Sequence, residues 1–475
     1  MLESIHKTKT RRRQITLLAI TTAIFGLYST IHLSGREAYI AGSPISKSVQ
    51  NGIETGSGLG MGGDGEGGRC KAIDYVLGKW ENVTQLKDEQ DLVESYGYSS
   101  WRDQDCWPPR FDKQQDKDFS PEDKLHQALK SASPMYIPRN GCHFADLNLE
   151  QMIVLMLRMP AGLFMAGDSI SGQFQLALNN LLIGPSSPAI FSEPTCQRRT
   201  ISLDPSHPLT PSLLQSAGVK ETRLSYPLMT WYRTVHLVDT EELVLAFNGS
   251  SKHVLRPDIC VWFDWFDRMS VTIRQALGEN KKDMGKEWGS EPTVLVVDTG
   301  PHWNTGALGE GLDDEEMMKA FEHMVTMMDR KMRNVPWPMA SYWRTTSPGH
   351  VGCAMSQQLD NERESYLDPS DPGHSMFNWH LFPRMNDLVR QIAIYDRSPS
   401  TFLRLSQKWL FSSAWEWVRP SNPPIRLVDV YDLSLKRPDA HLRPGADCLH
   451  YCISGVPDVW QRMLWTFIFE ESYSL

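Results

Sequence analysis

The chain has 475 residues, of which 41% are hydrophobic and 22% are charged, so it is long enough to bury a large core and is not an intrinsically disordered chain. Its formal net charge is −9 at pH 7. Nucleic-acid binding requires clustered cations that replace phosphate counterions, so the acidic charge argues against a nucleic-acid partner. It favours a neutral or weakly charged substrate.

The N-terminus combines a basic segment with an apolar one. Five Lys and Arg residues against one Glu give residues 1–13 a charge of +4, and we expect this segment to be a cytosolic tail. Residues 14–33 carry no charge and match the ~20 residues of a membrane-crossing helix. The positive-inside rule then predicts a type II signal anchor with a lumenal remainder. A cleaved signal peptide is the alternative, but the apolar run is longer than a usual signal-peptide core.

The composition changes twice after the anchor. Residues 34–69 are rich in Gly and Ser, with nine glycines between Gly52 and Gly68, and predict a flexible stem. From residue 70 to 475, apolar runs alternate with helical patterns, which predicts one continuous α/β domain. The sequons at Asn82 and Asn248 are compatible with lumenal N-glycosylation.

Eight cysteines follow the anchor, and an even lumenal set predicts a disulfide framework. Eight cysteines allow 105 pairings, among which the sequence does not choose. They are Cys70, Cys106, Cys142, Cys196, Cys260, Cys353, Cys448 and Cys452.

Four β-like runs end directly in a polar motif. In an open α/β sheet, ligands bind beyond the carboxyl ends of the strands, so we expect the four motifs to gather at one edge. The runs are GLFMAGDS at 162–169, TVLVVDTGPHW at 293–303, MASYWRTTSP at 339–348 and IRLVDVYDL at 425–433.

Ser169 stands where the first of these runs becomes a helix. Apolar residues from Phe174 to Leu182 recur at helical spacing, so a helix follows Ser169 directly. A serine at this junction exposes its hydroxyl beside backbone N–H groups and the positive end of the helix dipole. The alternative is that Ser169 or Asp168 simply caps the helix.

Asp447 and His450, near the C-terminus, form a candidate acid–base pair. A carboxylate can hold Nδ1–H of the imidazole and leave Nε2 free to take a proton from a serine. We expect the pair on a loop whose shape is fixed by the half-cystines Cys448 and Cys452. Metal ligation by these residues and a structural role for His450 are the alternatives, although lumenal cysteines are normally oxidised and the spacing is not a usual zinc pattern.

Together the motifs resemble the trichome birefringence-like and PC-esterase family of polysaccharide O-acetyltransferases. The resemblance rests on GDS at 167–169, DTGPHW at 298–303, WRTTSPGH at 343–350 and DCLHYCISGVPDVW at 447–460. CKAIDYVLGKW at 70–80 and CWPP at 106–109 are similar to the start of the family's domain. The resemblance covers the chain from Cys70 to its end and implies an SGNH-like three-layer α/β/α fold with a mostly parallel central sheet.

By this resemblance, Ser169 is the nucleophile, His450 the base and Asp447 the residue that orients the base. Asp168 belongs to the motif but is not the triad acid. The backbone N–H of Ser169 would help to form the oxyanion hole, with support from the motif residues Gly167, Asp168 and Gly172. Ser171 stands where the different nucleophile elbow of α/β-hydrolases requires a glycine.

The chain departs from the family pattern at three places. Gly172-Gln173 replaces the Arg-Asn of many plant members, Ile453-Ser454 replaces Leu-Pro, and Trp303-Asn304 replaces two tryptophans. The first departure lies beside the nucleophile, so it bears on acceptor identity more than on the triad.

Several further residues are candidates for substrate contact. Trp303 and Trp343 could stack on sugar faces, although most tryptophans are packing residues. For Arg344 and His350, a structural salt bridge or a hydrogen bond that locks the loop is equally compatible with the sequence. The candidates are Gln173, Trp303, Asn304, Arg344 and His350.

Two other patterns predict structure rather than chemistry. Asp439 and His441 imitate an acid–base pair, and we interpret them as structural. The Met-rich segment at 315–332 has helical spacing and predicts core packing rather than a metal site. We expect no metal site and no bound cofactor.

The resemblance implies a Golgi enzyme, single-pass type II, that moves acetyl groups onto glycan hydroxyls through an acetyl-serine. An O-acetylesterase on the same triad and an inactive glycan-binding protein are the alternatives. The expected co-substrate is acetyl-CoA or an intermediate acetyl donor. The expected partners are a polysaccharide acceptor, the membrane, and a membrane protein that supplies the donor, without any nucleic acid.

Overall fold

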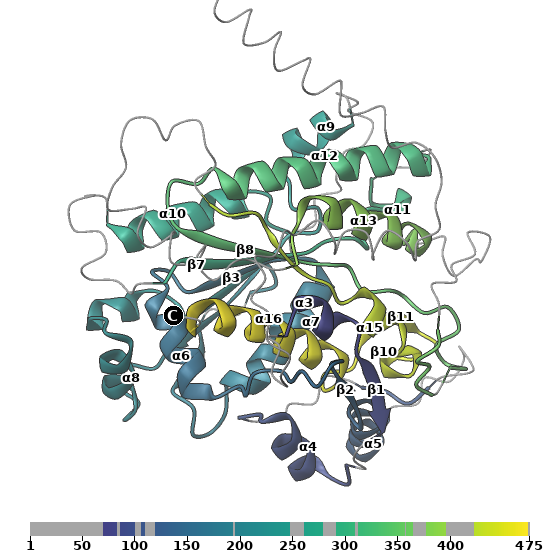
Figure 1. Ribbon diagram of the computed structural model, residues 1–475, viewed down its shortest axis with the longest axis horizontal. Coiled ribbons are helices and arrows are strands. Elements are labelled where there is room, and N and C mark those ends of the chain that lie inside the picture. The colour runs from purple at the N-terminus through teal and green to yellow at the C-terminus, as the bar shows by residue number, and fades with distance from the viewer. Residues whose placement is uncertain are drawn as a thin grey trace, which may run out of the picture. The chain divides into compact units, whose positions relative to one another are not determined.

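A seven-stranded sheet organises the domain, with its strands in the order β4-β5-β6-β3-β7-β8-β9 (Figure 1). The strands from β6 to β9 run parallel, whereas β5 pairs antiparallel with both β4 and β6. This mixed, mostly parallel sheet confirms the α/β class. The strands are β3 (Leu163–Gly167), β4 (Ala189–Ser192), β5 (Arg198–Leu203), β6 (Met229–Arg233), β7 (Thr293–Val297), β8 (Met339–Arg344) and β9 (Arg426–Val428).

The computed structural model describes most of the chain beyond residue 69. Arg69–Leu475 forms one compact unit. The described residues are 70–82, 86–99, 106–109, 119–192, 195–247, 261–278, 291–308, 312–356, 358–363, 377–395 and 422–473.

The central strands are buried along their whole length. Every residue of β3, β7 and β8 is buried, and these strands read as nearly continuous apolar runs. That pattern is typical of a parallel sheet covered on both faces, because no side of the strand meets water. The four runs predicted from the sequence are β3, β7, β8 and β9, which lie next to one another, so the expectation that they gather is confirmed.

Helices cover both faces of the sheet (Figure 1). One face carries α6 (Leu149–Arg158), α7 (Ser169–Leu182) and α16 (Val456–Tyr473), and the other carries α10 (Trp265–Leu277), α12 (Asp314–Arg333) and α13 (Phe382–Ile392). The remaining described helices are α3 (Ala72–Val76), α4 (Glu89–Tyr96), α5 (Pro121–Ala132), α8 (Thr210–Ala217), α9 (Thr240–Ala246), α11 (Thr305–Leu308) and α15 (Tyr431–Leu435), with 3-10 turns η1 (Glu221–Ser225), η2 (Trp379–Leu381) and η4 (Pro438–Ala440).

The Met-rich helix α12 packs as the sequence predicts. Asp313 and Glu316 form a capping box at its start, and its last turn is basic, so both ends suit the helix dipole. Its buried residues include five methionines, which confirms the core interpretation.

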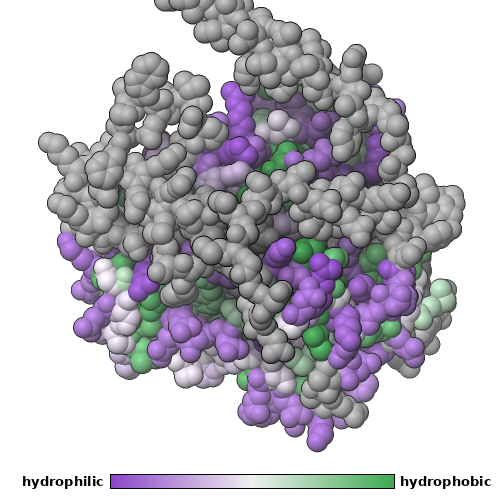
Figure 2. Space-filling model, viewed as in Figure 1, coloured by the Kyte–Doolittle hydropathy of each residue, from purple (hydrophilic) through white to green (hydrophobic). Residues whose placement is uncertain are grey.

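On the face viewed in Figure 2, the described residues present mainly hydrophilic side chains with hydrophobic ones between them.

Two small antiparallel sheets lie outside the main sheet. One pairs β1 (Lys79–Asn82) with β2 (Pro134–Ile137), and the other pairs β10 (His441–Arg443) with β11 (Asp447–Tyr451). The expectation of a loop around Asp447 and His450 is therefore wrong, because the two residues begin and nearly end strand β11. Pairing with β10 extends the backbone there.

Several expectations concern residues that the structure does not describe. The tail at 1–13, the anchor at 14–33, the stem at 34–69, Asn248 and Cys260 all lie outside the described residues. Among the residues that are described, no helix is both long enough and apolar enough to cross a bilayer. Asn82 is exposed at the end of β1.

Candidate active site

Ser169 is the first residue of α7 and follows β3 after one intervening residue. That residue, Asp168, is the N-cap, and its Oδ1 accepts from the backbone N–H of Ile170 at 2.9 Å. Asp168 and Ile170 are buried, whereas Ser169 is only partly buried. The capping function thus falls to Asp168, and the hydroxyl of Ser169 stays available.

The junction requires a glycine at its start. A Cβ on Gly167 would lie 1.9 Å from Oδ1 of Asp298, at the end of the neighbouring strand β7. The ends of β3 and β7 can approach this closely only because Gly167 has no side chain. The packing of the sheet edge therefore sets the turn that leads to Ser169.

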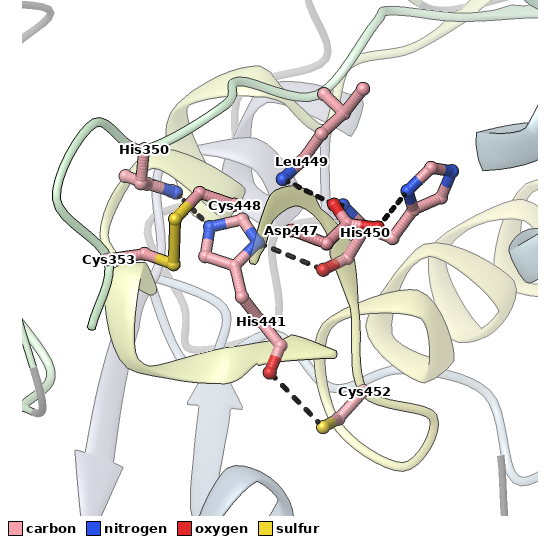
Figure 3. Close-up of a disulfide and its surroundings, with 8 residues drawn as sticks. All are labelled: His350, Cys353, His441, Asp447, Cys448, Leu449, His450 and Cys452. Carbon is pink, nitrogen blue, oxygen red and sulfur yellow. Dashed lines mark hydrogen bonds and ion pairs between the residues drawn. A yellow bond between two sulfur atoms is a disulfide. The ribbon is translucent and has the colours of Figure 1, made fainter. Parts of the chain in front are cut away.

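His450 and Asp447 lie on β11 of the β10–β11 hairpin, beside the disulfide between Cys353 and Cys448 (Figure 3). Cys448, between the two residues, is bonded to Cys353, and Cys452 is bonded to Cys106. A third disulfide joins Cys70 to Cys142, and Cys196 is also disulfide-bonded. The predicted disulfide framework is confirmed for the described cysteines.

Ser169, His450 and Asp447 form a continuous hydrogen-bonded series. His450 Nε2 lies 2.7 Å from Ser169 Oγ, and His450 Nδ1 lies 2.8 Å from Asp447 Oδ2. Because a carboxylate can only accept, Nδ1 of the neutral imidazole carries the proton, and Nε2 is left to accept from the serine hydroxyl. The structure thus brings together the three residues that the sequence singled out.

The surroundings of Asp447 keep it ionised. Partial burial raises the pKa of this carboxyl, but the hydrogen bond and charge of His450 and the backbone N–H groups of Leu449 and His450 outweigh burial, so the pKa lies well below its ordinary value. The side chains of Asp447 and His450 are 30% and 24% exposed. Asp447 is therefore ionised, and the pair is open to solvent.

Two further histidines, His350 and His441, lie close to the strand that carries His450 (Figure 3). His441 Nδ1 lies 2.9 Å from the carbonyl oxygen of His450, and His441 Nε2 lies 2.7 Å from His350 Nδ1. Burial lowers the pKa of His441 to about 4 and lowers that of His350 well below its ordinary value, so both rings are neutral at neutral pH. Their contacts brace the backbone that carries His450.

The first turn of α7 contains the expected oxyanion donor, the N–H of Ser169. An α-helix leaves the N–H groups of its first turn without helical partners. The carboxylate of Asp168 accepts from the N–H of Ile170, and the N–H of Gly172 donates to the carbonyl of Asp168 at 3.0 Å. A Cβ on Gly172 would come within 3.3 Å of the Trp231 ring, so Gly172 lets this ring pack against the helix.

The structure places the candidate substrate contacts inside the protein. Trp303, Asn304, Arg344 and His350 are at most 3% exposed. Trp303 packs edge-on against Phe321, and Asn304 Oδ1 accepts from the N–H of Ala307 at the start of α11. An acceptor contact by these four residues stays a prediction, and each has a partner within the domain.

Arg344 links the ends of β7 and β8 to helix α16. It pairs with Asp298 at the end of β7, donates to the carbonyl of Thr345 at 3.1 Å, and lies over the Trp460 ring at 4.7 Å. Burial lowers its pKa to about 10, so the guanidinium remains charged at neutral pH. Arg344 therefore joins the DTGPHW and WRTTSPGH motifs beneath the sheet edge.

The WRTTSPGH segment also braces the hairpin. The N–H of His350 donates to the carbonyl of Cys448 at 2.8 Å, and Tyr451 Oη donates to the carbonyl of Pro348 at 2.8 Å. The sequence predicts no role for Tyr451 and a structural role for His441, without indicating its partner. The position of RPDAH just before the Asp447 motif was the available signal.

A serine at the carboxyl edge of a mostly parallel sheet, bonded to a histidine that an aspartate orients, has the geometry of serine acyl-ester chemistry. Residues 288–467 match the PC-Esterase family, described as the GDSL/SGNH-like acyl-esterase family found in Pmr5 and Cas1p. The match covers His450 and Asp447, and Ser169 lies upstream of it. The family resemblance predicted from the motifs is confirmed.

Curated relatives agree with this family at a distance. The chain is 37% identical over 127 residues to "Xylan O-acetyltransferase 3" of Oryza sativa subsp. japonica, which is 23% of this chain and 21% of the relative. It is 40% identical over 55 residues to "Protein trichome birefringence-like 41" of Arabidopsis thaliana, which is 10% of this chain and 15% of the relative. The chain thus spans about a fifth or less of the length of these relatives.

Proposed function

We propose that the chain is a glycan O-acetyltransferase of SGNH-like fold that works through an acetyl-serine intermediate. In this proposal Ser169 is the nucleophile, His450 the general base and Asp447 the residue that orients it. The observation that carries the proposal is the 2.7 Å contact between Ser169 Oγ and His450 Nε2, with Asp447 on the other ring nitrogen.

The geometry supports the following first half-reaction. Ser169 Oγ attacks the carbonyl carbon of the acetyl donor while its proton passes to His450 Nε2. The oxyanion that forms lies beside the N–H of Ser169, at the positive end of α7. Collapse breaks the bond to the leaving group, which takes the proton from His450 and leaves an acetyl ester on Ser169.

The second half-reaction repeats these steps with the acceptor. A glycan hydroxyl gives its proton to His450 Nε2 and attacks the acetyl carbon. Collapse then transfers the acetyl group to the sugar, and the proton returns to Ser169 Oγ. The carboxylate of Asp447 stabilises the imidazolium that exists between the two proton transfers.

A polysaccharide acceptor is supported by the relatives. Two relatives are named xylan O-acetyltransferases and match this chain at 37% identity over 127 residues. The net charge of −9 is compatible with a neutral sugar polymer. The acetyl donor in the proposal is acetyl-CoA or an intermediate donor delivered by a membrane partner.

An O-acetylesterase is the second candidate, and the exposure of the site favours it. With 24% and 30% of the His450 and Asp447 side chains exposed, water can reach the base and replace the sugar hydroxyl in the second step. The matched family is described as acyl-esterases. Transfer and hydrolysis would share the first half-reaction and differ in the acceptor.

The proposal places the enzyme in the Golgi membrane as a single-pass type II protein. The apolar run at 14–33 with its basic flank supports an uncleaved anchor. Disulfides at Cys70, Cys106 and Cys353 support an oxidising lumen around the domain. Protease protection of the domain in sealed Golgi vesicles tests this placement.

Replacing Ser169 with Ala tests the proposed function. If the chain is an acetyltransferase or esterase, Ser169→Ala removes the acetyl acceptor of the first step, and turnover of acetyl esters falls to background. Retained glycan binding would be compatible with either enzyme. Acetyl transfer at the wild-type rate by Ser169→Ala would contradict the proposal, and the absence of turnover by a folded wild-type chain that binds glycans would indicate a binding protein.

A further inference from the structure

The side chain of Gln173 closes the open edge of the strand that carries His450. Its Nε2 donates to the carbonyl oxygen of Tyr451 at 2.5 Å, and its Oε1 accepts from the backbone N–H of Tyr451 at 2.9 Å. On the β10 side, the neighbouring N–H of Cys452 donates to the carbonyl of Ala440 at 2.8 Å. Gln173 thus gives β11 the two-point contact that an adjacent strand would give it.

This contact lies one helical turn from the nucleophile. Ser169 and Gln173 are four residues apart on α7, so they share a face of the helix. That face meets β11 twice, through Ser169 Oγ with His450 Nε2 and through Gln173 with Tyr451. Because the nitrogen of Tyr451 is bonded to the carbonyl carbon of His450, fixing this amide also fixes the backbone of His450.

We call the two hydrogen bonds between Gln173 and Tyr451 the clamp. The clamp controls the distance between His450 and Ser169, not the contact between His450 and Asp447. Asp447 and His450 both lie on β11 and bond each other within that strand. Their contact therefore survives any movement of the strand as a whole. The distance from His450 to Ser169 depends instead on how β11 sits against α7.

The chemistry of the contact requires an amide. Gln173 is 6% exposed, so both Tyr451 backbone groups meet it out of water. A carboxylate would still accept from the N–H but would face the carbonyl oxygen with a second acceptor. An apolar side chain would leave a donor and an acceptor unpaired, which is costly when they are buried.

We propose that Gln173 is a positioning residue that holds β11 against α7, so that His450 stays within hydrogen-bonding reach of Ser169. The inference rests on the proposed function of these two residues. It also replaces the sequence-based expectation that Gln173 contacts the acceptor, because both of its amide atoms are used within the protein.

The test compares Gln173→Met and Gln173→Glu with Gln175→Met in the full chain. Gln175 is a matched control because it is buried on the same helix, but its amide bonds Asn179 and Arg199 instead of β11. The rate of acetyl-serine formation from a small acetyl ester is measured per folded molecule, together with KM and the downfield proton resonance of His450 Nδ1–H. The Glu variant keeps the size and one acceptor contact of Gln173, so it serves if the Met variant does not fold.

Both Gln173 variants are expected to lower the rate of acetyl-serine formation about 100-fold, the loss typical of a small misplacement of reacting groups. KM and the downfield resonance should stay near their wild-type values, because the Asp447–His450 pair is unchanged, and Gln175→Met should react at nearly the wild-type rate. A folded Gln173 variant with the wild-type rate, or a loss shared equally by Gln175→Met, would overturn the inference. Ser169→Ala separates the two proposals. If Ser169→Ala is fully active, the proposed function is wrong. If Ser169→Ala is inactive and Gln173→Met is fully active, only the proposed role of Gln173 is wrong.

Discussion

The two ends of the candidate site are held in different ways. Ser169 lies between two buried elements. Every residue of β3 is buried, and so is every residue of α7 except Ser169 and Leu176. His450 and Asp447 stand on a two-stranded hairpin outside the main sheet, with partly exposed side chains. Two disulfides, the contact between His350 and His441, and Gln173 fix this hairpin to the rest of the domain.

The difference separates stability from catalysis. Packing that folds the sheet also places Ser169, the proposed nucleophile, so large changes around it should unfold the domain. A few specific links place His450, the proposed base, so changes there should reduce the rate more than they reduce stability. Four sets of substitutions test this contrast.

His450→Ala should have the largest effect on the rate. Loss of the base leaves the Ser169 hydroxyl protonated, and comparable triads then lose on the order of 10⁴–10⁶ in kcat. His380 is a matched control, since its Nε2 lies 2.8 Å from the carboxylate of Asp314 and the proposal gives it no part in the reaction. Ester turnover and thermal melts of His450→Ala and His380→Ala check the prediction, which fails if both variants retain similar activity.

Asp447→Asn should cost somewhat less. The amide can donate to Nδ1, which shifts the ring proton to Nε2 and leaves no lone pair facing Ser169 Oγ. We expect kcat to fall about 10³–10⁴-fold with little change in the melting temperature, because this side chain is 30% exposed. A loss of less than tenfold in steady-state turnover would mean that Asp447 does not orient the base.

Removal of the Cys353–Cys448 disulfide should affect both stability and rate. Its chain separation of 95 residues resembles the 72 of Cys70–Cys142, so the two differ by only about 0.2 kcal/mol in chain entropy. Each paired Cys→Ser variant should lose about 2–5 kcal/mol in the free energy of unfolding.

The rate per folded molecule should separate these two disulfide variants. It should fall for Cys353→Ser/Cys448→Ser, which frees β11, and stay near wild type for Cys70→Ser/Cys142→Ser, whose bond joins the start of α3 to the segment after β2. Denaturant unfolding and active-site titration measure the two quantities. Equal rates would show that this disulfide only stabilises the fold.

Asp458 gives a smaller, pH-dependent effect. Burial raises its pKa from 3.8 to about 6, although Tyr98 Oη and the N–H of Gly455 donate to it. The folded state therefore binds this proton more tightly than the unfolded chain, so its contribution to stability is full below about pH 4 and is lost as the pH rises through 6. Two pKa units correspond to roughly 3 kcal/mol.

Asp458→Asn removes this titration, so its free energy of unfolding should vary less between pH 4.5 and pH 8, with about 2 kcal/mol more stability than wild type at pH 8. Unfolding by urea at the two pH values measures the change. Because Asp458 lies beyond the hairpin at the start of α16, turnover at pH 7 should change little. An unchanged pH dependence would show that Asp458 is ionised in the folded state.

The strand and helix around Ser169 could be predicted from the sequence, because the patterns that indicate them are local. The apolar run before Gly167 and the helical spacing after Ser169 are short-range patterns, and they gave β3 and α7 correctly. The pairing of Asp447 with His450 was also predictable, since both residues lie within one motif. The family resemblance linked this motif to Ser169, 281 residues away.

The arrangement around His450 was harder to predict from the sequence, because the contacts that hold it join distant segments. Nothing in the sequence around Gln173 indicates that its amide reaches the backbone of Tyr451, 278 residues later. The Cys residues beside His450 suggested a cross-linked loop, but the β10 pairing that makes it a strand depends on tertiary contacts. Trp303, Arg344 and His350 follow strand ends, and only the packing of the sheet edge shows that they are buried.

Mass spectrometry of the full chain after mixing with a small acetyl ester tests the central claim most directly. We predict an acetyl adduct on Ser169 that passes to an added xylan oligosaccharide faster than to water, and that is absent from Ser169→Ala. An adduct that only hydrolyses would favour the esterase. Acetyl transfer to sugar by a folded chain without any adduct on Ser169 would contradict the claim that the three residues act as a nucleophilic triad.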